Sequence, residues 1–478
     1  MMNIPAKILS LRLLAFCLVL LLMISCSGLV FVWAEPENEG EDDAKFKEKP
    51  EISGASAVLI DADTGQILFK KKAKNKREPA STTKIMTAML ALENLNKKDK
   101  LTLRDDFEYR YQDSSIALVP GEKVSVNDLL YAALLASGND AALALAEGVS
   151  GTEEEFVDLM NERVKEMGLK KTHFANPHGL HDEKHYSSAY DLAMIAREAM
   201  KNKDFRKYVK TYEHQMKETN KQAARLVHNS NRLLYSEGWH VMVYGERRVI
   251  KDDEVTGVKT GYTTDSRNTL VASAKRDGLS LIAVSLKSEG VMEYQDVLNM
   301  FEYGFHNYTH KPFIKAGEEL PLDEPFEIEV KEGVGTTVGA VAAEDIITTV
   351  KKDKEAKGLF IRTSVAALTA PVEEGQVIGQ AIVTVGEKED AYVVGETDLL
   401  ASSFIAKEKK GVFEGIKLPA FLPLALKIGG VLIGLAAAWV IIILVRAENK
   451  RRSRRMRRMY GYRGDGITKE VKRIKRIK

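Results

Sequence analysis

The sequence is nearly free of cysteine. Only Cys17 and Cys26 occur among 478 residues, and both lie within the first 34. The rest of the chain therefore cannot form a disulfide framework, which excludes the small disulfide-stabilised secreted folds. No internal repeat is present, which excludes a repeat architecture. A hydrophobic content of 45% excludes a disordered or fibrous chain, and the length is sufficient for two or three globular units.

Net charge is also low, at +2, but it is unevenly distributed. Residues 446–478 hold fifteen Lys or Arg against three Asp or Glu, so this tail carries +12 and residues 1–445 carry −10. No aromatic or motif context in the tail supports nucleic-acid binding. Phospholipid headgroups are the simpler partner.

Long hydrophobic runs are found at only two places, one near each end. Residues 1–34 contain two basic residues, the run LLAFCLVLLLMIS and a small residue, Ala34, before the acidic EPENEGEDD. This order predicts a secretory signal peptide that is cleaved after Ala34, followed by an acidic linker over residues 35–52. The alternatives are an uncleaved N-terminal anchor and a lipid attached at Cys26, although MIS before Cys26 is a poor context for lipid attachment.

The second run, IGGVLIGLAAAWVIIILV, covers residues 428–445 and contains no charge. Eighteen apolar residues suit a transmembrane helix, and the basic residues that follow place the tail, residues 446–478, in the cytoplasm. A buried core helix is the alternative. We therefore expect a globular part outside the cytoplasm, held at the cell membrane through a linker over residues 406–427.

The globular part divides into two segments with different patterns of apolar and polar residues. Residues 53–310 predict an α+β domain, an antiparallel sheet closed by both ends of the domain with helices packed on it. The pattern predicts a hairpin over 57–71, helices over 83–95, 126–147, 153–167 and 189–200, and strands over 269–274 and 281–286. Residues 311–405 show short alternating runs separated by Gly and Pro, which predicts a small all-β sandwich.

A serine and a lysine stand three residues apart at the start of an apolar helical run. In PASTTKIMTAMLALE, Ser81 and Lys84 fall on one face of the helix, so their side chains can meet. The run is apolar on nearly every side, which indicates burial, and burial disfavours the charged form of an amine. A neutral Lys84 could therefore take the proton of Ser81. Pro79 suits a helix start, where the helix dipole would stabilise an oxyanion.

Two further triplets carry polar groups into apolar surroundings. SGN at residues 137–139 interrupts the helical run LLYAALLASGNDAALALAE, which is costly unless the break faces a cleft. KTG at residues 259–261 precedes two strand-like runs, where its glycine would let a substrate backbone approach closely. A Ser-x-x-Lys spacing alone is expected about twice by chance in such a chain. The three motifs in this order are specific.

These motifs resemble those of the serine-type D-alanyl-D-alanine carboxypeptidases, the low-molecular-mass penicillin-binding proteins. The resemblance covers residues 53–427 and includes AVLIDADTGQILF, FANPHGLHDEKHYSSAYDLAMIA, LVASAKRDGLSLIAVSL and TAPVEEGQVIGQAIV. It implies a β-lactamase/transpeptidase-like catalytic domain over residues 53–310. It also implies peptidoglycan stem peptides ending in D-Ala-D-Ala as substrate, β-lactam antibiotics as covalent inhibitors, and no cofactor.

The resemblance assigns catalytic roles to three residues. Ser81 is the expected acyl-ester nucleophile, and Lys84 is its proton acceptor. Ser137 is expected to pass a proton toward the leaving D-alanine.

The resemblance also implies how the substrate is held. Asn139 would hold the peptide, and Lys259 and Thr260 would bind the terminal carboxylate beside the close-approach position Gly261. Backbone N–H groups of Ser81 and of a residue just after the KTG triplet would form the oxyanion hole.

Two positions depart from the family's pattern. After KTGYT the family commonly continues with a small residue and glycine, whereas this chain has DSRN at residues 265–268. The family often has an arginine just before the last strand of the catalytic domain, and here Ser280 aligns with it. Both departures bear on carboxylate binding and on substrate preference.

Three histidines, His178, His181 and His185, have a spacing that could suggest a zinc site. Asn-Pro-His-Gly is typical of a turn, however, and the family has this segment without metal, so we expect no metal site. Glu155 and Asn161 resemble a β-lactamase deacylating glutamate only loosely. We therefore expect a penicillin acyl-enzyme to turn over slowly.

The leading hypothesis is hydrolysis of the terminal D-alanine from a pentapeptide stem. A transpeptidase or endopeptidase on the same site is the alternative enzyme, and product analysis separates the two. A catalytically silent wall-binding protein is the alternative from another class, and the intact SxxK, SxN and KTG motifs disfavour it.

Overall fold

The computed structural model describes residues 45–107, 114–322, 325–354, 358–385, 392–408 and 439. The predicted signal peptide, the first part of the acidic linker, the linker beyond residue 408, the predicted transmembrane helix apart from Trp439, and the basic tail lie outside these residues. No helix in the described part of the chain has the length and hydrophobicity needed to cross a membrane. The described residues from 45 to 407 form one compact unit.

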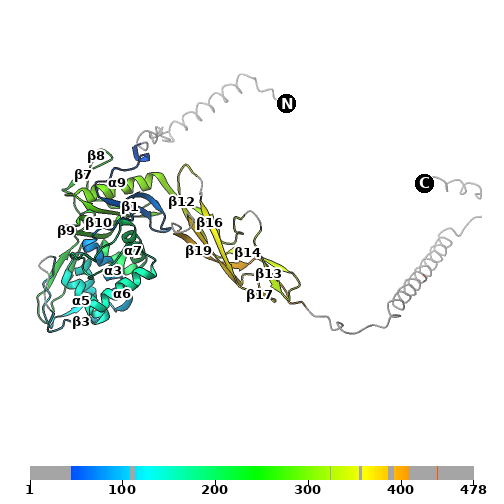
Figure 1. Ribbon diagram of the computed structural model, residues 1–478, viewed down its shortest axis with the longest axis horizontal. Helices are drawn as coiled ribbons and strands as arrows, with labels where there is room; N and C mark the ends of the chain where they lie inside the picture. Colours follow the sequence, from blue (N-terminus) through cyan, green and yellow to red (C-terminus); the bar gives the residue numbers. More distant parts are fainter. Residues whose placement is uncertain are drawn as a thin grey trace, which may run out of the picture. The chain divides into compact units, whose positions relative to one another are not determined.

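The catalytic domain is built on a five-stranded sheet (Figure 1). The strand order is β2-β1-β11-β10-β9, and each neighbouring pair is antiparallel. The N-terminal hairpin thus pairs directly with the last strands of the domain, as the sequence predicted. The strands are β1 (Ser56–Asp61), β2 (Ile67–Lys71), β9 (Val255–Thr263), β10 (Arg267–Arg276) and β11 (Leu279–Ser288).

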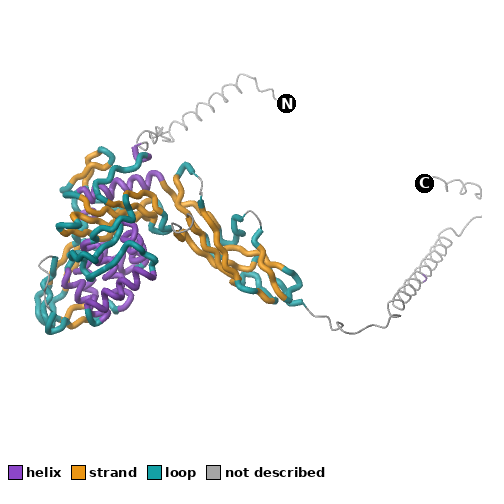
Figure 2. Tube along the Cα trace, in the orientation of Figure 1, coloured by secondary structure: helices purple, strands orange, loops and turns teal. Residues whose placement is uncertain are grey.

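Helices cover both faces of this sheet, as Figure 2 shows. Val58 and Ile60 of β1 pack into a core formed with the large helical layer, whereas Ala57 and Leu59 face the core under α9. The strand is therefore buried on both sides, which explains its continuous apolar sequence. The helical layer contains α3 (Lys84–Asn94), α4 (Val126–Leu134), α5 (Asn139–Ser150), α6 (Glu153–Glu166), α7 (Ala189–Lys201) and α8 (Lys203–Lys210), and α9 is Met292–Asn307.

Two expected helices differ from the structure. The run over 126–147 forms two helices, because the chain leaves the helix after Leu134 and Ser137 takes a left-handed φ of 61°. The run over 83–95 begins as a 3-10 turn, η2 (Ala80–Thr83), and becomes α-helical only at Lys84. In both places the chain departs from regular helix at a residue of one of the three sequence motifs.

Part of the expected acidic linker belongs to the catalytic domain. Residues 45–47 form a 3-10 turn, η1 (Lys45–Lys47), in which Phe46 stacks on His306 with ring centroids 4.0 Å apart. Ile52 is also buried. The side chains of Phe46 and Ile52, with a hydrogen bond from Asn307 Nδ2 to the Phe46 carbonyl at 2.6 Å, attach this charged segment to the domain. Three short strand pairs complete the domain: β3 (Lys100–Thr102) with β4 (Lys123–Ser125), β5 (Glu213–Met216) with β6 (Arg225–His228), and β7 (His240–Val243) with β8 (Glu246–Val249). A 3-10 turn, η3 (Arg232–Leu234), lies between β6 and β7.

The second segment is all-β, as predicted. A strand pair and a six-stranded sheet of order β16-β18-β19-β14-β13-β17 share one hydrophobic core. The first strand begins at Tyr308, so the domain boundary lies about three residues before the expected one. His310 on this strand donates to Asp61 of the catalytic domain at 2.7 Å. The strands are β12 (Tyr308–Ile314), β13 (Glu327–Lys331), β14 (Thr337–Ala342), β15 (Ile346–Lys351), β16 (Leu359–Val365), β17 (Leu368–Thr369), β18 (Val377–Val385) and β19 (Tyr392–Ala401).

A buried carboxylate on α9 joins the two ends of the catalytic domain. Asp296 is fully buried and accepts hydrogen bonds from the backbone N–H groups of Ser53 (2.7 Å) and Gly54 (2.9 Å). It also accepts from the hydroxyls of Ser285 and Ser288 at 2.7 and 3.0 Å. This carboxylate therefore ties the start of the domain to β11.

Replacing this carboxylate should destabilise the fold. Asp296→Ala leaves the buried N–H group of Gly54 and the buried hydroxyl of Ser285 without this acceptor, so we expect it to lower the free energy of unfolding by about 3 kcal/mol. The matched control, Asp253→Ala, removes an exposed carboxylate and should cost less than about 0.5 kcal/mol. Urea unfolding followed by circular dichroism measures both, and equal stabilities would contradict the assignment.

Candidate active site

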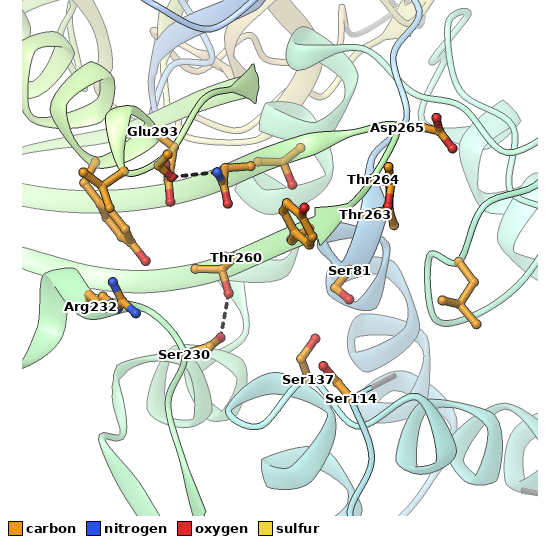
Figure 3. A pocket seen from close by; sticks show the side chains of 18 of the residues that line it. Ser81, Ser114, Ser137, Ser230, Arg232, Thr260, Thr263, Thr264, Asp265 and Glu293 are labelled. Carbon is orange, nitrogen blue, oxygen red and sulfur yellow. Dashed lines mark hydrogen bonds between the residues drawn. The ribbon is translucent and has the colours of Figure 1, made fainter. Parts of the chain in front are cut away.

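A cleft of about 800 Å³ lies between β9 and the helical layer (Figure 3). Ser81, Ser137 and Thr260 line it, each from a different motif. In Figure 3 the hydroxyl of Ser137 points toward Ser81 from the break between α4 and α5. The fold thus brings together one residue from each of the three sequence motifs.

Lys84 is fully buried behind Ser81. Its Nζ lies 3.0 Å from Ser81 Oγ, 2.7 Å from Asn139 Oδ1 and 2.7 Å from the backbone carbonyl of His178. The two carbonyl oxygens can only accept hydrogen bonds, whereas the serine hydroxyl can also donate one. The amine is therefore held by two N–H donations while it faces the hydroxyl.

The backbone that carries Ser81 is packed so closely that glycine is required at two neighbouring positions. Ala80, just before Ser81, has a left-handed φ of 48°. A Cβ on Gly179 would lie 1.9 Å from the carbonyl oxygen of Ala80, and one on Gly261 would lie 3.0 Å from the Ser81 nitrogen. Strand β9 and the Asn-Pro-His-Gly turn thus both lie close to the backbone of Ala80 and Ser81, and this packing fixes the position of Ser81.

The residues of the KTG triplet differ in position: Thr260 lies in the cleft, whereas Lys259 lies in the interior. Thr260 faces the cleft, where its Oγ1 lies 2.6 Å from Ser230 Oγ. Lys259 is 1% exposed and is not among the residues that line the cleft; its Nζ donates to the Thr260 carbonyl at 3.0 Å. Burial lowers the pKa of Lys259 to about 7. Thr260 and Ser230 are thus placed for direct contact, and Lys259 acts from behind them.

Asn139 opens α5, and Asp140 beside it holds the neighbouring loop. The buried carboxylate of Asp140 accepts from Ser115 Oγ at 2.7 Å and from the backbone N–H of Leu118 at 3.0 Å. The Asn139 N–H donates to the carbonyl of Ser114, which lines the cleft. Asp140 therefore positions this wall of the cleft.

The three histidines occupy three separate environments. His185 accepts at Nδ1 from the Ala175 N–H, so its Nε2–H donates to Thr83 Oγ1 at 2.8 Å. Burial lowers its pKa to about 3, which keeps the ring neutral. His178 contributes its carbonyl to Lys84, and burial lowers the pKa of its ring. His181 lies at the cleft mouth, 3.1 Å from a carboxylate oxygen of Glu78.

Neither departure from the family's pattern lies beside Thr260 in the part of the cleft that Ser230 lines. In the DSRN turn, Ser266 is buried and accepts from the Thr263 N–H at 2.8 Å, while Asp265 lines the cleft at its other end.

The strand register places Ser280 away from Thr260. The antiparallel register places Thr260 opposite Leu270 and Leu270 opposite Ser285. Ser280 is five residues further along β11, or about 16 Å.

Sequence reasoning missed Ser230, Asp140 and the His178 carbonyl. The sequence offered one indication for Asp140, because this residue directly follows the SGN motif. The His178 contact is made by a backbone carbonyl, so the type of side chain could not predict it. The glycine that follows His178 indicated only that the chain turns there. Ser230 lies in an irregular segment, and only the register of β9 brings it to Thr260.

Known proteins resemble this chain over both of its domains. Residues 43–290 match the sequence family described as D-alanyl-D-alanine carboxypeptidase, and residues 308–407 match the family described as penicillin-binding protein 5, C-terminal domain. The D-alanyl-D-alanine carboxypeptidase DacF of Bacillus subtilis (strain 168) is 34% identical over 388 residues, which are 80% of this chain and 93% of that protein. This chain belongs to the D-alanyl-D-alanine carboxypeptidase family.

Two further relatives agree with this assignment. The D-alanyl-D-alanine carboxypeptidase DacA of Haemophilus influenzae is 33% identical over 356 residues, covering 72% of this chain and 84% of that protein. The crystal structure of penicillin binding protein 5 from Haemophilus influenzae superposes with a TM-score of 0.57 at 29% identity, covering 75% of this chain and 99% of that one. The protein is a serine-type D-Ala-D-Ala carboxypeptidase, of a family that acts on peptidoglycan stems and binds β-lactams.

The buried lysine of this carboxypeptidase should make carboxylate recognition depend on pH. A pKa of about 7 means that Lys259 is charged below pH 7 and loses its proton above it, so its attraction for a carboxylate fades as pH rises. We expect kcat/KM for a D-Ala-D-Ala peptide to fall above about pH 7 relative to that for its C-terminal amide. Rate profiles of both substrates test this. Lys259→Arg should remove the difference, and parallel wild-type profiles would contradict it.

Proposed function

We propose that this carboxypeptidase removes the terminal D-alanine of pentapeptide stems through an acyl ester at Ser81. Lys84 takes the proton of Ser81 as the hydroxyl attacks the carbonyl of the penultimate D-alanine. Ser137 passes a proton to the nitrogen of the leaving D-alanine. Water then attacks the ester and releases the tetrapeptide stem.

The contacts of the Lys84 amine carry this proposal. A neutral amine has two N–H donors and one lone pair, and two carbonyl acceptors, Asn139 Oδ1 and the His178 oxygen, match the two donors. In this form the lone pair can accept the proton of the Ser81 hydroxyl, whose Oγ lies 3.0 Å from Nζ. Burial favours this neutral form, because the ammonium would lose its hydration.

The remaining groups bind and polarise the peptide. The backbone N–H of Ser81 and that of Tyr262, the residue after the KTG triplet, supply the oxyanion hole. Thr260 binds the terminal carboxylate, with Lys259 supplying positive charge from behind. Asn139 holds the peptide and Lys84 at once.

Two substitutions test the catalytic pair. Ser81→Ala should abolish covalent labelling by a fluorescent penicillin. Lys84→Arg keeps the positive charge but cannot act as a neutral base, so acylation should slow by at least about 10²-fold. Stopped-flow acylation is measured beside a thermal melt for each variant. Normal acylation by folded Lys84→Arg would make the lysine a structural charge.

Product analysis separates the proposed reaction from its alternatives. With a pentapeptide stem as substrate, we expect free D-alanine and a tetrapeptide. A cross-linked dimer, or cleavage of a dimer, would instead indicate transpeptidation or endopeptidase activity.

We also propose that the carboxypeptidase is exported and held at the outer face of the cell membrane. The support comes from the sequence alone: a signal-like segment over residues 1–34, and the uncharged run over 428–445 followed by the basic tail. At about 1.5 Å per residue, eighteen residues just span a hydrocarbon layer of roughly 30 Å.

Membrane attachment should depend on the segment after residue 410. A chain ending at Lys410 should be soluble and active, because the catalytic cleft lies wholly within the preceding residues. The full-length chain should stay with the membrane during carbonate extraction. Release of the full-length chain by carbonate would refute a spanning helix.

A further inference from the structure

The cleft continues past Thr260, on the side away from Ser81. Figure 3 shows Arg232 and Glu293 on that side, whereas Thr263 and Asp265 lie toward the Ser81 side. In the proposed reaction the scissile carbonyl lies at Ser81 and the carboxylate of the leaving residue lies at Thr260. This arm of the cleft therefore adjoins the leaving residue.

Arg232 lines this arm and contributes a cationic guanidinium with N–H donors. The guanidinium of Arg232 stacks on Trp239, with Cζ 3.9 Å from the ring centroid. No hydrogen bond or ion pair engages this guanidinium within the described residues. Stacking fixes its plane and leaves its N–H donors for a ligand, and a carboxylate is the group that fits them best.

An unsatisfied acid lines the same arm. Glu293, in the first turn of α9, is only 6% exposed, and it lines the cleft beside Tyr294. Its Oε2 atom is buried and has no hydrogen-bond partner in the described part of the chain. A buried carboxylate oxygen without a partner is costly. Burial raises the pKa of Glu293 to about 7, and a ligand ammonium would satisfy the oxygen and hold the group ionised.

We propose that Arg232, Trp239, Glu293 and Tyr294 form a leaving-group subsite for basic D-amino acids. Arg232 binds the carboxylate of the leaving residue together with Thr260, and Glu293 binds the ammonium at the end of its side chain. The substrate class is a stem that ends in D-Ala-D-Xaa, where Xaa is a residue such as D-lysine. The subsite rests on the proposed acyl-enzyme reaction.

The chemistry is the same acyl transfer in both directions. In cleavage, the amide bond between the D-alanine carbonyl carbon and the Xaa nitrogen breaks, the ester to Ser81 forms, and the leaving nitrogen gains a proton. In the reverse step, the amine of free D-lysine attacks that ester. The amide forms, the ester breaks, and the proton lost by the amine returns to Ser81 Oγ.

Tripeptides that differ only in the last residue test the subsite. Diacetyl-L-lysyl-D-alanyl-D-Xaa is prepared with D-alanine, D-lysine or D-norleucine, the last being an uncharged chain of similar length. We expect wild-type kcat/KM for D-lysine to exceed that for D-norleucine by about tenfold or more. In Glu293→Gln this ratio should fall to about one. Glu289→Gln, an exposed neighbour outside the cleft, should keep the wild-type ratio.

The outcomes separate the subsite from the reaction itself. Failure to release D-alanine from the D-Ala-D-Ala peptide would overturn the proposed reaction. Normal release of D-alanine, with a D-lysine to D-norleucine ratio near one in the wild type or unchanged in Glu293→Gln, would overturn the subsite alone.

A second measurement needs no variant. Free D-lysine and D-norleucine compete as acyl acceptors while the wild-type enzyme turns over the D-Ala-D-Ala peptide, and mass spectrometry counts the exchanged products. Preferential incorporation of D-lysine supports the subsite, and equal incorporation overturns it even if Glu293→Gln does not fold.

Discussion

The buried amine of Lys84 is the interaction on which the site depends. Its partners come from three separate segments: η2 carries Ser81, the start of α5 carries Asn139, and the Asn-Pro-His-Gly turn supplies the His178 carbonyl. A buried amine without partners would be costly, so these segments must be in place together. The requirement couples the packing of the helical layer to the geometry of catalysis.

The same requirement explains where the backbone is strained. Ala80 and Ser137 both have left-handed φ angles, at 48° and 61°, and each adjoins or carries a catalytic hydroxyl. Such conformations are costly for residues other than glycine and persist only when the surroundings fix them. Here the surroundings are the close contacts of Gly179 and Gly261 with the segment that holds Ser81. Strand β9 and the Asn-Pro-His-Gly turn thus both constrain Ser81.

The electrostatic character of the cleft follows from what is buried around it. Lys259 lies behind Thr260 with its pKa lowered to about 7, and Glu293 lies in the far arm with its pKa raised to about 7. Both shifts have desolvation as their main cause. Because a ligand charge of the opposite sign would restore the ionised form of each group, the cleft suits a ligand that carries both an anion and a cation.

The sequence by itself determined the N-terminal hairpin, the last two strands of the sheet, most helices, the β-domain and the three motifs, because these depend on local periodicity and on residue types at short spacings. It did not reveal α9, whose aromatic and apolar residues are buried on nearly every side and leave no clear amphipathic stripe. Only the tertiary structure decided which distant groups meet: the His178 carbonyl at Lys84, Ser230 at Thr260, and Glu293 in the cleft. The tertiary structure also showed that Ser280 lies away from the site. Its distance from Thr260 depends on the pairing register of β9, β10 and β11, which no local sequence pattern encodes.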